Sequence, residues 1–135
     1  MMVLLKSFLI SFASFAILDF IWLGFIMKDF NMRQLSELGR IENGQFNVGY
    51  GAAVVVYIMM GLAITFFVRE KVLEIDSYLH CFAYGAFLGL IVYGIYDFTN
   101  LAILKNYPLA FALVDVAWGT FLFGTVTIIV KKMGI

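Results

Sequence analysis

Three aspartates lie inside long apolar stretches of the sequence: Asp19, Asp97 and Asp115. An ionised carboxyl group that faces lipid is costly, so aspartates within membrane segments usually face the interior of a helix bundle and mark a functional site. The nearest cations, Lys28 and Lys105, lie at the ends of these stretches, where their side chains normally extend to the lipid headgroups. Without a fixed counter-ion, at least one carboxyl group should stay protonated near neutral pH. The aspartates therefore predict a site that binds protons or cations, or a catalytic pocket that uses them as acid and base.

Each aspartate is followed, three residues later, by a side chain that could hold a carboxyl group. In a helix this spacing puts both side chains on one side, and tryptophan and asparagine both offer N–H donors. A tyrosine one turn before Asp97 adds a hydroxyl group. The candidate site consists of Asp19, Trp22, Tyr93, Asp97, Asn100, Asp115 and Trp118. The alternative is a structural role, in which hydrogen-bonded aspartates hold the helices in register.

The segments that carry these residues are predicted to be membrane-spanning helices. Of the 135 residues, 64% are hydrophobic and only 13% are charged, and the mean hydropathy is +1.00. A soluble domain carries about 25% charged residues, so a soluble monomer is excluded. A membrane helix needs about 20 apolar residues, and four such runs cover residues 7–27, 48–68, 79–104 and 109–130. The predicted fold is an all-α integral membrane protein, a single domain in which four transmembrane helices form a bundle with short loops.

The alternating directions of these helices put the three aspartates at one depth. A helix rises about 1.5 Å per residue, so each aspartate lies about 9–12 Å from the same membrane face. The ends and connections on the two sides hold five and four basic residues, a small bias that favours both termini in the cytoplasm. With that orientation, the carboxyl groups share a layer in the outer third of the bilayer.

The connections are uneven in length. Residues 28–47 form the only long one, which suits either a short helix on the membrane surface or a solvated loop. A short charged connection is predicted over residues 69–78, and a tight turn is predicted over residues 105–108. Aromatic residues near the predicted boundaries indicate an interfacial belt and not ligands: Phe30, Tyr50, Tyr78, Tyr84 and Tyr107. Gly85 and Gly89 favour close helix packing within the chain over a dimer interface.

Charge and residue counts exclude several classes of function. Nine basic and nine acidic residues give zero net charge, which does not suit a nucleic-acid binder. The single cysteine, Cys81, cannot form an internal disulfide, and together with the single histidine, His80, it falls short of a metal-ligand set. The sequence shows no nucleophile beside a base and no glycine-rich phosphate loop. Neither a metal nor a cofactor is predicted.

Three blocks of the sequence resemble those of a known family. Residues 18–24, 93–102 and 114–120 read LDFIWLG, YGIYDFTNLA and VDVAWGT. In this order and spacing they resemble the domain of unknown function 2177 family, a family of small bacterial membrane proteins. The resemblance covers nearly the whole chain and implies an inner-membrane protein with four spans. It implies no activity, because the family has no assigned function.

Three kinds of function remain open for a protein in the lipid bilayer. The favoured one is binding or transport of a proton, a cation or another small molecule, with Trp22 and Trp118 offering aromatic faces to a cationic group. Four spans are too few to enclose a path alone, so this function would require a homodimer. The second is an accessory subunit whose polar layer docks onto a partner. The third is a membrane-embedded enzyme that uses paired carboxyl groups on a lipid-like substrate.

Overall fold

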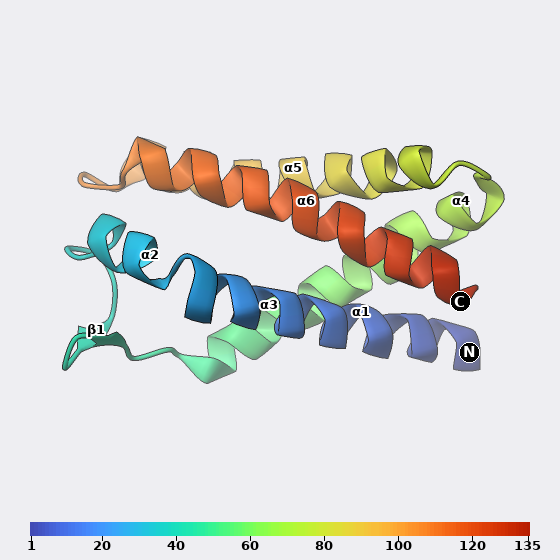
Figure 1. Ribbon diagram of the computed structural model, residues 1–135, viewed down its shortest axis with the longest axis horizontal. Helices are drawn as coiled ribbons and strands as arrows, with labels where there is room; N and C mark the ends of the chain where they lie inside the picture. Colours follow the sequence, from blue (N-terminus) through green and yellow to red (C-terminus); the bar gives the residue numbers. More distant parts are fainter.

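Four long helical segments run in alternating directions along the molecule in the computed structural model, which describes residues 1–135 (Figure 1). Both termini lie at one end, and the long first connection lies at the other. Each segment is long and apolar enough to cross a membrane, with mean hydropathies between 1.6 and 2.3. The segments are α1 Met2–Ile21 with the π-helical η1 Trp22–Ile26; α3 Tyr50–Ala63 with η2 Ile64–Val68 and α4 Arg69–Glu74; α5 Tyr78–Ile103; and α6 Leu109–Met133. The predicted all-α fold with four membrane helices is confirmed.

The long first connection contains both a short helix and a hairpin. The helix, α2, covers Lys28–Gln34, so a surface helix forms only in the first third of this connection. Strands β1 Ile41–Glu42 and β2 Gln45–Phe46 then pair antiparallel. Asn43 and Gly44 join them with φ values of 52° and 72°, the left-handed conformation that the tightest hairpin turns require. The Asn-Gly pair explains why the chain turns here and does not continue as a helix.

The predicted connection over residues 69–78 is wrong for most of its length. Helix α4 continues the second segment to Glu74, and only residues 75–77 are non-helical. Arginine, glutamate and lysine are good helix formers, so their charges mark where the helix leaves the membrane and not where it ends. Lys131 of α6 donates hydrogen bonds to the carbonyl oxygens of Leu73 and Ile75, which fastens the end of α4 to the last helix.

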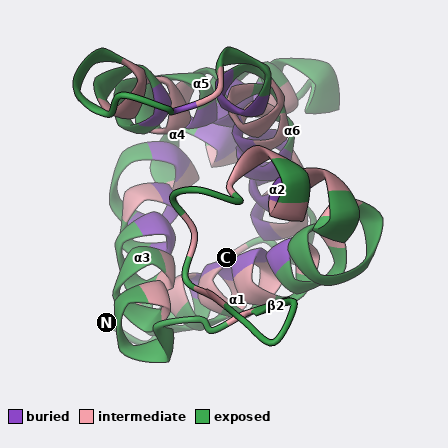
Figure 2. Cartoon of the chain, turned by 90° about the vertical axis from the view of Figure 1, so that its left-hand side faces the viewer, coloured by how far each residue is buried: buried purple, intermediate pink, exposed green.

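The molecule is apolar outside and partly polar inside. Only 26 of 135 residues are buried, because the outward faces of four helices carry apolar side chains suited to lipid. Figure 2 shows the buried residues on the inward faces of the helices and the exposed residues around them. The buried polar side chains are Ser7, Ser11, Asp19, Asn31, Thr65, Asp97 and Thr127. Of these side chains, Asp19 and Asp97 are the costliest to bury in a membrane protein, so the positions of their carboxyl groups are the first place to look for a site.

Helices α5 and α6 form the tightest pair because glycines let their backbones approach. A Cβ atom on Gly85 would overlap the Thr127 side chain, and one on Gly89 would overlap the carbonyl oxygen of Gly119. In membranes, where water drives no helix association, such close contact between backbones is a main source of packing energy. Gly85 and Gly89 thus pack within the chain, as predicted, and they hold α5 and α6 in the register that determines which side chains meet.

Candidate functional site

The first aspartate is bound by a residue from the opposite end of the sequence. Trp118 of α6 donates its indole N–H to a carboxyl oxygen of Asp19 on α1, with 2.6 Å between the two atoms. Asp19 is only 5% exposed, so this bond replaces water that the carboxyl group has lost. The Trp22 ring stacks on Trp118 with a centroid distance of 4.3 Å and an interplanar angle of 2°. Trp22 begins η1, and π-helical turns often occur at functional sites.

The second aspartate, Asp97 of α5, is bound from the turn between α5 and α6. The Tyr107 hydroxyl donates to its Oδ1 atom at 2.7 Å. Asp97 is completely buried, and its other carboxyl oxygen, Oδ2, has no hydrogen-bond partner. Burial and the hydrogen bond to Asp97 raise the pKa of Tyr107, so the phenol keeps its proton and remains a donor at neutral pH. Asp97 therefore has one oxygen that accepts a hydrogen bond and one without a donor, and the carboxyl group of Asp115 is near enough to share a proton with it.

The third aspartate lies between the other two. The half-buried Asp115 on α6 neighbours the Asp97 carboxyl group and also lies within electrostatic range of Asp19. The ring of Tyr93 on α5 packs directly against Gly119, one turn after Asp115. Only glycine leaves room for it, since a Cβ atom at position 119 would overlap the tyrosine ring. The three carboxyl groups and Tyr93 therefore gather where α1, α5 and α6 meet. We call Asp19, Asp97 and Asp115 the aspartate cluster.

The predicted pairing of each aspartate with a residue on its own helix is wrong in detail. Asp19 is bonded to Trp118 and not to Trp22, and the partner of Asp97 is Tyr107 and not Asn100. Asn100 lies instead beside the hydroxyl groups of Tyr96 and Tyr107. The physical reason is that two side chains on one face of a helix both extend toward the neighbouring elements, and these supply the donors: helix α6 for Asp19 and the turn before α6 for Asp97.

Two tyrosines belong to this site that sequence reasoning did not select. Tyr107 was expected in the interfacial belt with Phe30, and that prediction is wrong because Tyr107 is only 8% exposed and points at Asp97. Phe30 packs against the small apolar cluster formed by Tyr107, Phe111 and Ala112. Tyr57 of α3 lies beside Asp19. Its position in the middle of an apolar run was a usable signal, since a hydroxyl group inside a membrane needs a partner.

A polar pocket lies at the surface on the side of the connecting loops, and Tyr107 is the one residue of the site that lines it. The pocket has a volume of about 410 Å³ and is lined by Arg33, Gln34, Ser36, Glu37, Asn106, Tyr107 and Pro108. Tyr107 therefore contacts both the pocket and Asp97. The Tyr107 side chain is therefore the polar link between the buried Asp97 carboxyl group and this surface of the molecule.

The geometry does not form a multidentate metal site. No three carboxylate, imidazole or thiolate side chains are arranged so that they could hold a metal ion together. The cluster instead offers neutral donors, two stacked indole rings and one unpartnered carboxyl oxygen. Such groups suit a proton or an organic cation, which need fewer ligands than a divalent metal.

Replacing Trp118 with phenylalanine should destabilise the protein by about 1–3 kcal/mol, because Asp19 would lose its N–H donor while remaining buried. Trp22→Phe is the matched control, since it also shortens an aromatic stack but removes no hydrogen bond to Asp19. Unfolding by a denaturing detergent would measure both losses. Equal losses in the two variants would show that the Trp118–Asp19 bond contributes nothing beyond the stacking.

Comparison with known proteins gives one match. A family model described as predicted membrane protein (DUF2177) matches residues 4–131. The matched region includes all seven candidate residues as well as Tyr57 and Tyr107. No match to the chain was found among curated proteins or solved structures.

Proposed function

Because this chain belongs to the DUF2177 family of predicted membrane proteins, we propose for it a function within the membrane: the aspartate cluster binds a proton and exchanges it for a small lipophilic cation. In each exchange one proton leaves a carboxyl group as one monovalent cation binds, so the charge inside the bundle does not change. Exchange at this site, reached in turn from the two sides of the membrane, would couple cation transport to proton movement.

The observation that carries the proposal is the unpartnered Oδ2 atom of the fully buried Asp97. Its neighbour is a second carboxyl group, that of Asp115, and no basic side chain is paired with either of them. The one salt bridge in the molecule, Lys71 to Glu74, lies on the exposed surface of α4. Two adjacent ionised carboxyl groups in hydrocarbon are unfavourable, so a proton or an outside cation must neutralise them.

The surroundings of the cluster favour an organic cation. Trp22 and Trp118 stack on each other beside Asp19, and the outer faces of the stacked pair would attract a cation that carries apolar substituents. The pocket at Tyr107 supports access from the side of the loops. A homodimer would supply the wall that four helices lack, and we include it in the proposal.

We also propose that the protein lies in a bacterial inner membrane with both termini in the cytoplasm. The two termini share one end of the molecule (Figure 1), and that end carries five of the nine basic residues. Positive charge is enriched on the cytoplasmic side of membrane proteins. In this orientation the polar pocket at Tyr107 opens on the outer side.

Adding tetraphenylphosphonium to the purified protein in a neutral detergent should release about one proton per bound cation, since exchange at a desolvated site must be electroneutral. A pH indicator in weak buffer would measure the release. The chain contains two tryptophans, Trp22 and Trp118, and both lie at the cluster, so their emission should change over the same range of concentration.

Detergent micelles without protein are the control for this experiment. Proton release with the same concentration dependence as the change in emission would support exchange at the cluster. Unchanged emission together with no release of protons would contradict the proposal.

A further inference from the structure

A second group of polar side chains, three of them buried and one partly buried, lies at the other end of the bundle, where the termini are. Ser7 and Ser11 are one turn apart on α1, and both are 0% exposed. Thr65 in η2 is 2% exposed, and Arg69 follows it by one turn at the start of α4. We call these four residues the arginine–serine strip. It takes no part in the aspartate cluster.

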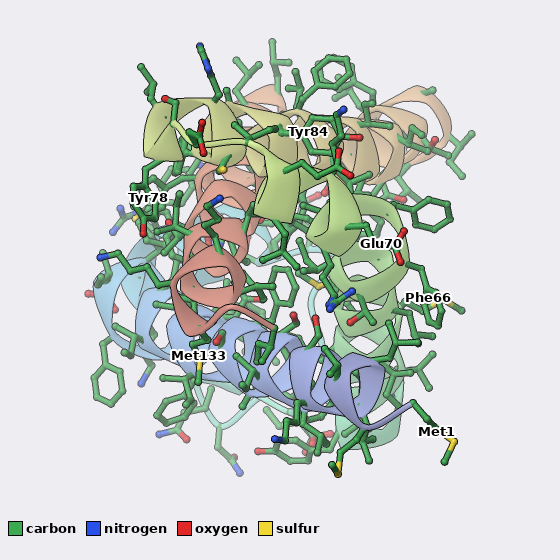
Figure 3. The ribbon with its side chains drawn as sticks, turned by 90° about the vertical axis from the view of Figure 1, so that its right-hand side faces the viewer. Met1, Phe66, Glu70, Tyr78, Tyr84 and Met133 are labelled. Atoms are coloured by element: carbon green, nitrogen blue, oxygen red, sulfur yellow. The ribbon has the colours of Figure 1, made fainter.

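The strip joins the first and second helical segments. The Thr65 hydroxyl donates to the Ser7 hydroxyl at 3.4 Å. Because the two segments run in opposite directions, Ser11 lies one turn deeper than this bond and Arg69 one turn nearer the end of the bundle. Figure 3 shows this end, where Phe66 and Glu70, the residues that follow Thr65 and Arg69, point away from the bundle.

Two polar atoms of the strip are buried without a partner, the Oγ atom of Ser11 and the Nε atom of Arg69. The third such atom in the molecule is Oδ2 of Asp97, in the aspartate cluster. Arg69 forms no salt bridge, and the adjacent Glu70 is exposed and points outward. Buried donors without a partner are rare in native proteins and indicate a missing water or ion. Arg69 is only partly buried, so its guanidinium group can be reached from the end of the bundle while its Nε–H remains available to a ligand.

We infer that the arginine–serine strip binds a phosphate group. A guanidinium group forms paired hydrogen bonds to phosphate oxygens, and serine and threonine hydroxyls can donate to the same oxygens. Lys6, Lys131 and Lys132 lie at the same end of the bundle and add positive charge that would attract an anion, whereas Lys71 there is already paired with Glu74. A π-helical turn, η2, carries Thr65 and leads directly into Arg69, and such turns are frequent at functional sites. The phosphate could belong to the headgroup of an anionic lipid or be free in solution.

The strip is separated from the aspartate cluster by an aromatic barrier. Phe15 lies one turn beyond Ser11 and one turn before Asp19 on the buried face of α1. Its ring packs against that of Phe123, with 4.7 Å between centroids, and both side chains are 0% exposed. Phosphate binding at the strip therefore does not depend on the cation exchange proposed for the cluster, and the two can be tested separately.

The test uses the full-length protein in a neutral detergent with three probes: a short-chain phosphatidylglycerol, the matching phosphatidylcholine, and inorganic phosphate. Native mass spectrometry counts bound lipid, and the shift in unfolding temperature reports binding of each probe. Arg69→Gln should weaken binding roughly tenfold or more, the usual effect of losing hydrogen bonds to a charged group. Ser11→Ala should weaken it by a smaller factor. Because Ser11 Oγ has no partner within the chain, Ser11→Ala should fold normally and carries the test even if Arg69→Gln does not fold.

Matched controls remove the same groups elsewhere. Lys71→Gln removes an exposed cation from the same helix as Arg69. Ser14→Ala removes a hydroxyl group from α1 at a partly buried position outside the strip. Asp97→Asn should leave phosphate and lipid binding unchanged. Preference for phosphatidylglycerol over the other probes would identify a lipid headgroup, and binding of inorganic phosphate alone would identify a free anion. Affinities for every probe that are equal in the Arg69→Gln, Ser11→Ala and control variants would overturn the inference.

Discussion

Asp97→Asn is expected to abolish cation-driven proton release and to weaken tetraphenylphosphonium binding at least about tenfold, because an amide neither releases a proton nor attracts a cation as a carboxylate does. The effect should be large because Asp97 is the only aspartate that is both completely buried and left with an unpartnered oxygen. The measurements are proton release in weak buffer and the emission of Trp22 and Trp118.

The substitution should preserve the fold, which makes the result interpretable. The amide oxygen can accept the Tyr107 hydrogen bond that Oδ1 accepts in the native protein. Asp76→Asn is the matched control, since Asp76 is exposed and lies outside the membrane helices. Proton release that remains at the native level in the folded Asp97→Asn variant would contradict the proposed exchange at this residue.

Gly89→Ala is expected to destabilise the protein by about 1–3 kcal/mol through overpacking, and by more if the helices cannot separate. The new Cβ atom would overlap the carbonyl oxygen of Gly119 and lie 2.7 Å from the Cβ atom of Phe123. The overlap is with backbone, which cannot move aside as the tip of a flexible side chain can. Helices α5 and α6 would have to shift apart, and Asp97 and Asp115 would shift with them.

Gly94→Ala is the control on the same helix, because nothing lies within 4 Å of the position that its Cβ atom would occupy. Alanine favours helix over glycine by about 1 kcal/mol, so this variant should be as stable as the native protein or slightly more stable. Unfolding in a denaturing detergent measures both. If Gly89→Ala proved as stable as Gly94→Ala, the close approach of α5 and α6 at Gly119 would be wrong.

The helices and their order could be predicted because the relevant signals are local. Apolar runs of the length of a bilayer determine helices on their own, and four of them in a short chain leave few arrangements. The errors came where local signals were ambiguous. Charges at residues 69–74 suit both a loop and a helix that has left the membrane, and only packing of α4 against α6 decides between them.

The aspartates could be selected from the sequence for the same reason, since the free-energy cost of a carboxyl group in hydrocarbon depends on its position in the apolar run and not on its neighbours. Their partners could not be selected in this way. Asp19 and Trp118 are 99 positions apart, and Tyr107 reaches Asp97 only because the turn folds back over the end of α5.

The arginine–serine strip likewise could not be recognised from the sequence, although its residues are plain in it. The sequence contains an arginine after one apolar run and three serines inside another, and neither feature is unusual alone. Only the pairing of α1 with η2 brings them together and leaves Ser11 Oγ and Arg69 Nε buried without partners. By itself, then, the sequence determined the membrane location, the four helices and the three costly carboxyl groups, because these follow from the transfer of each residue into lipid. The tertiary structure alone decided which polar groups meet and which remain unsatisfied, because that depends on how closely and in what register the helices pack.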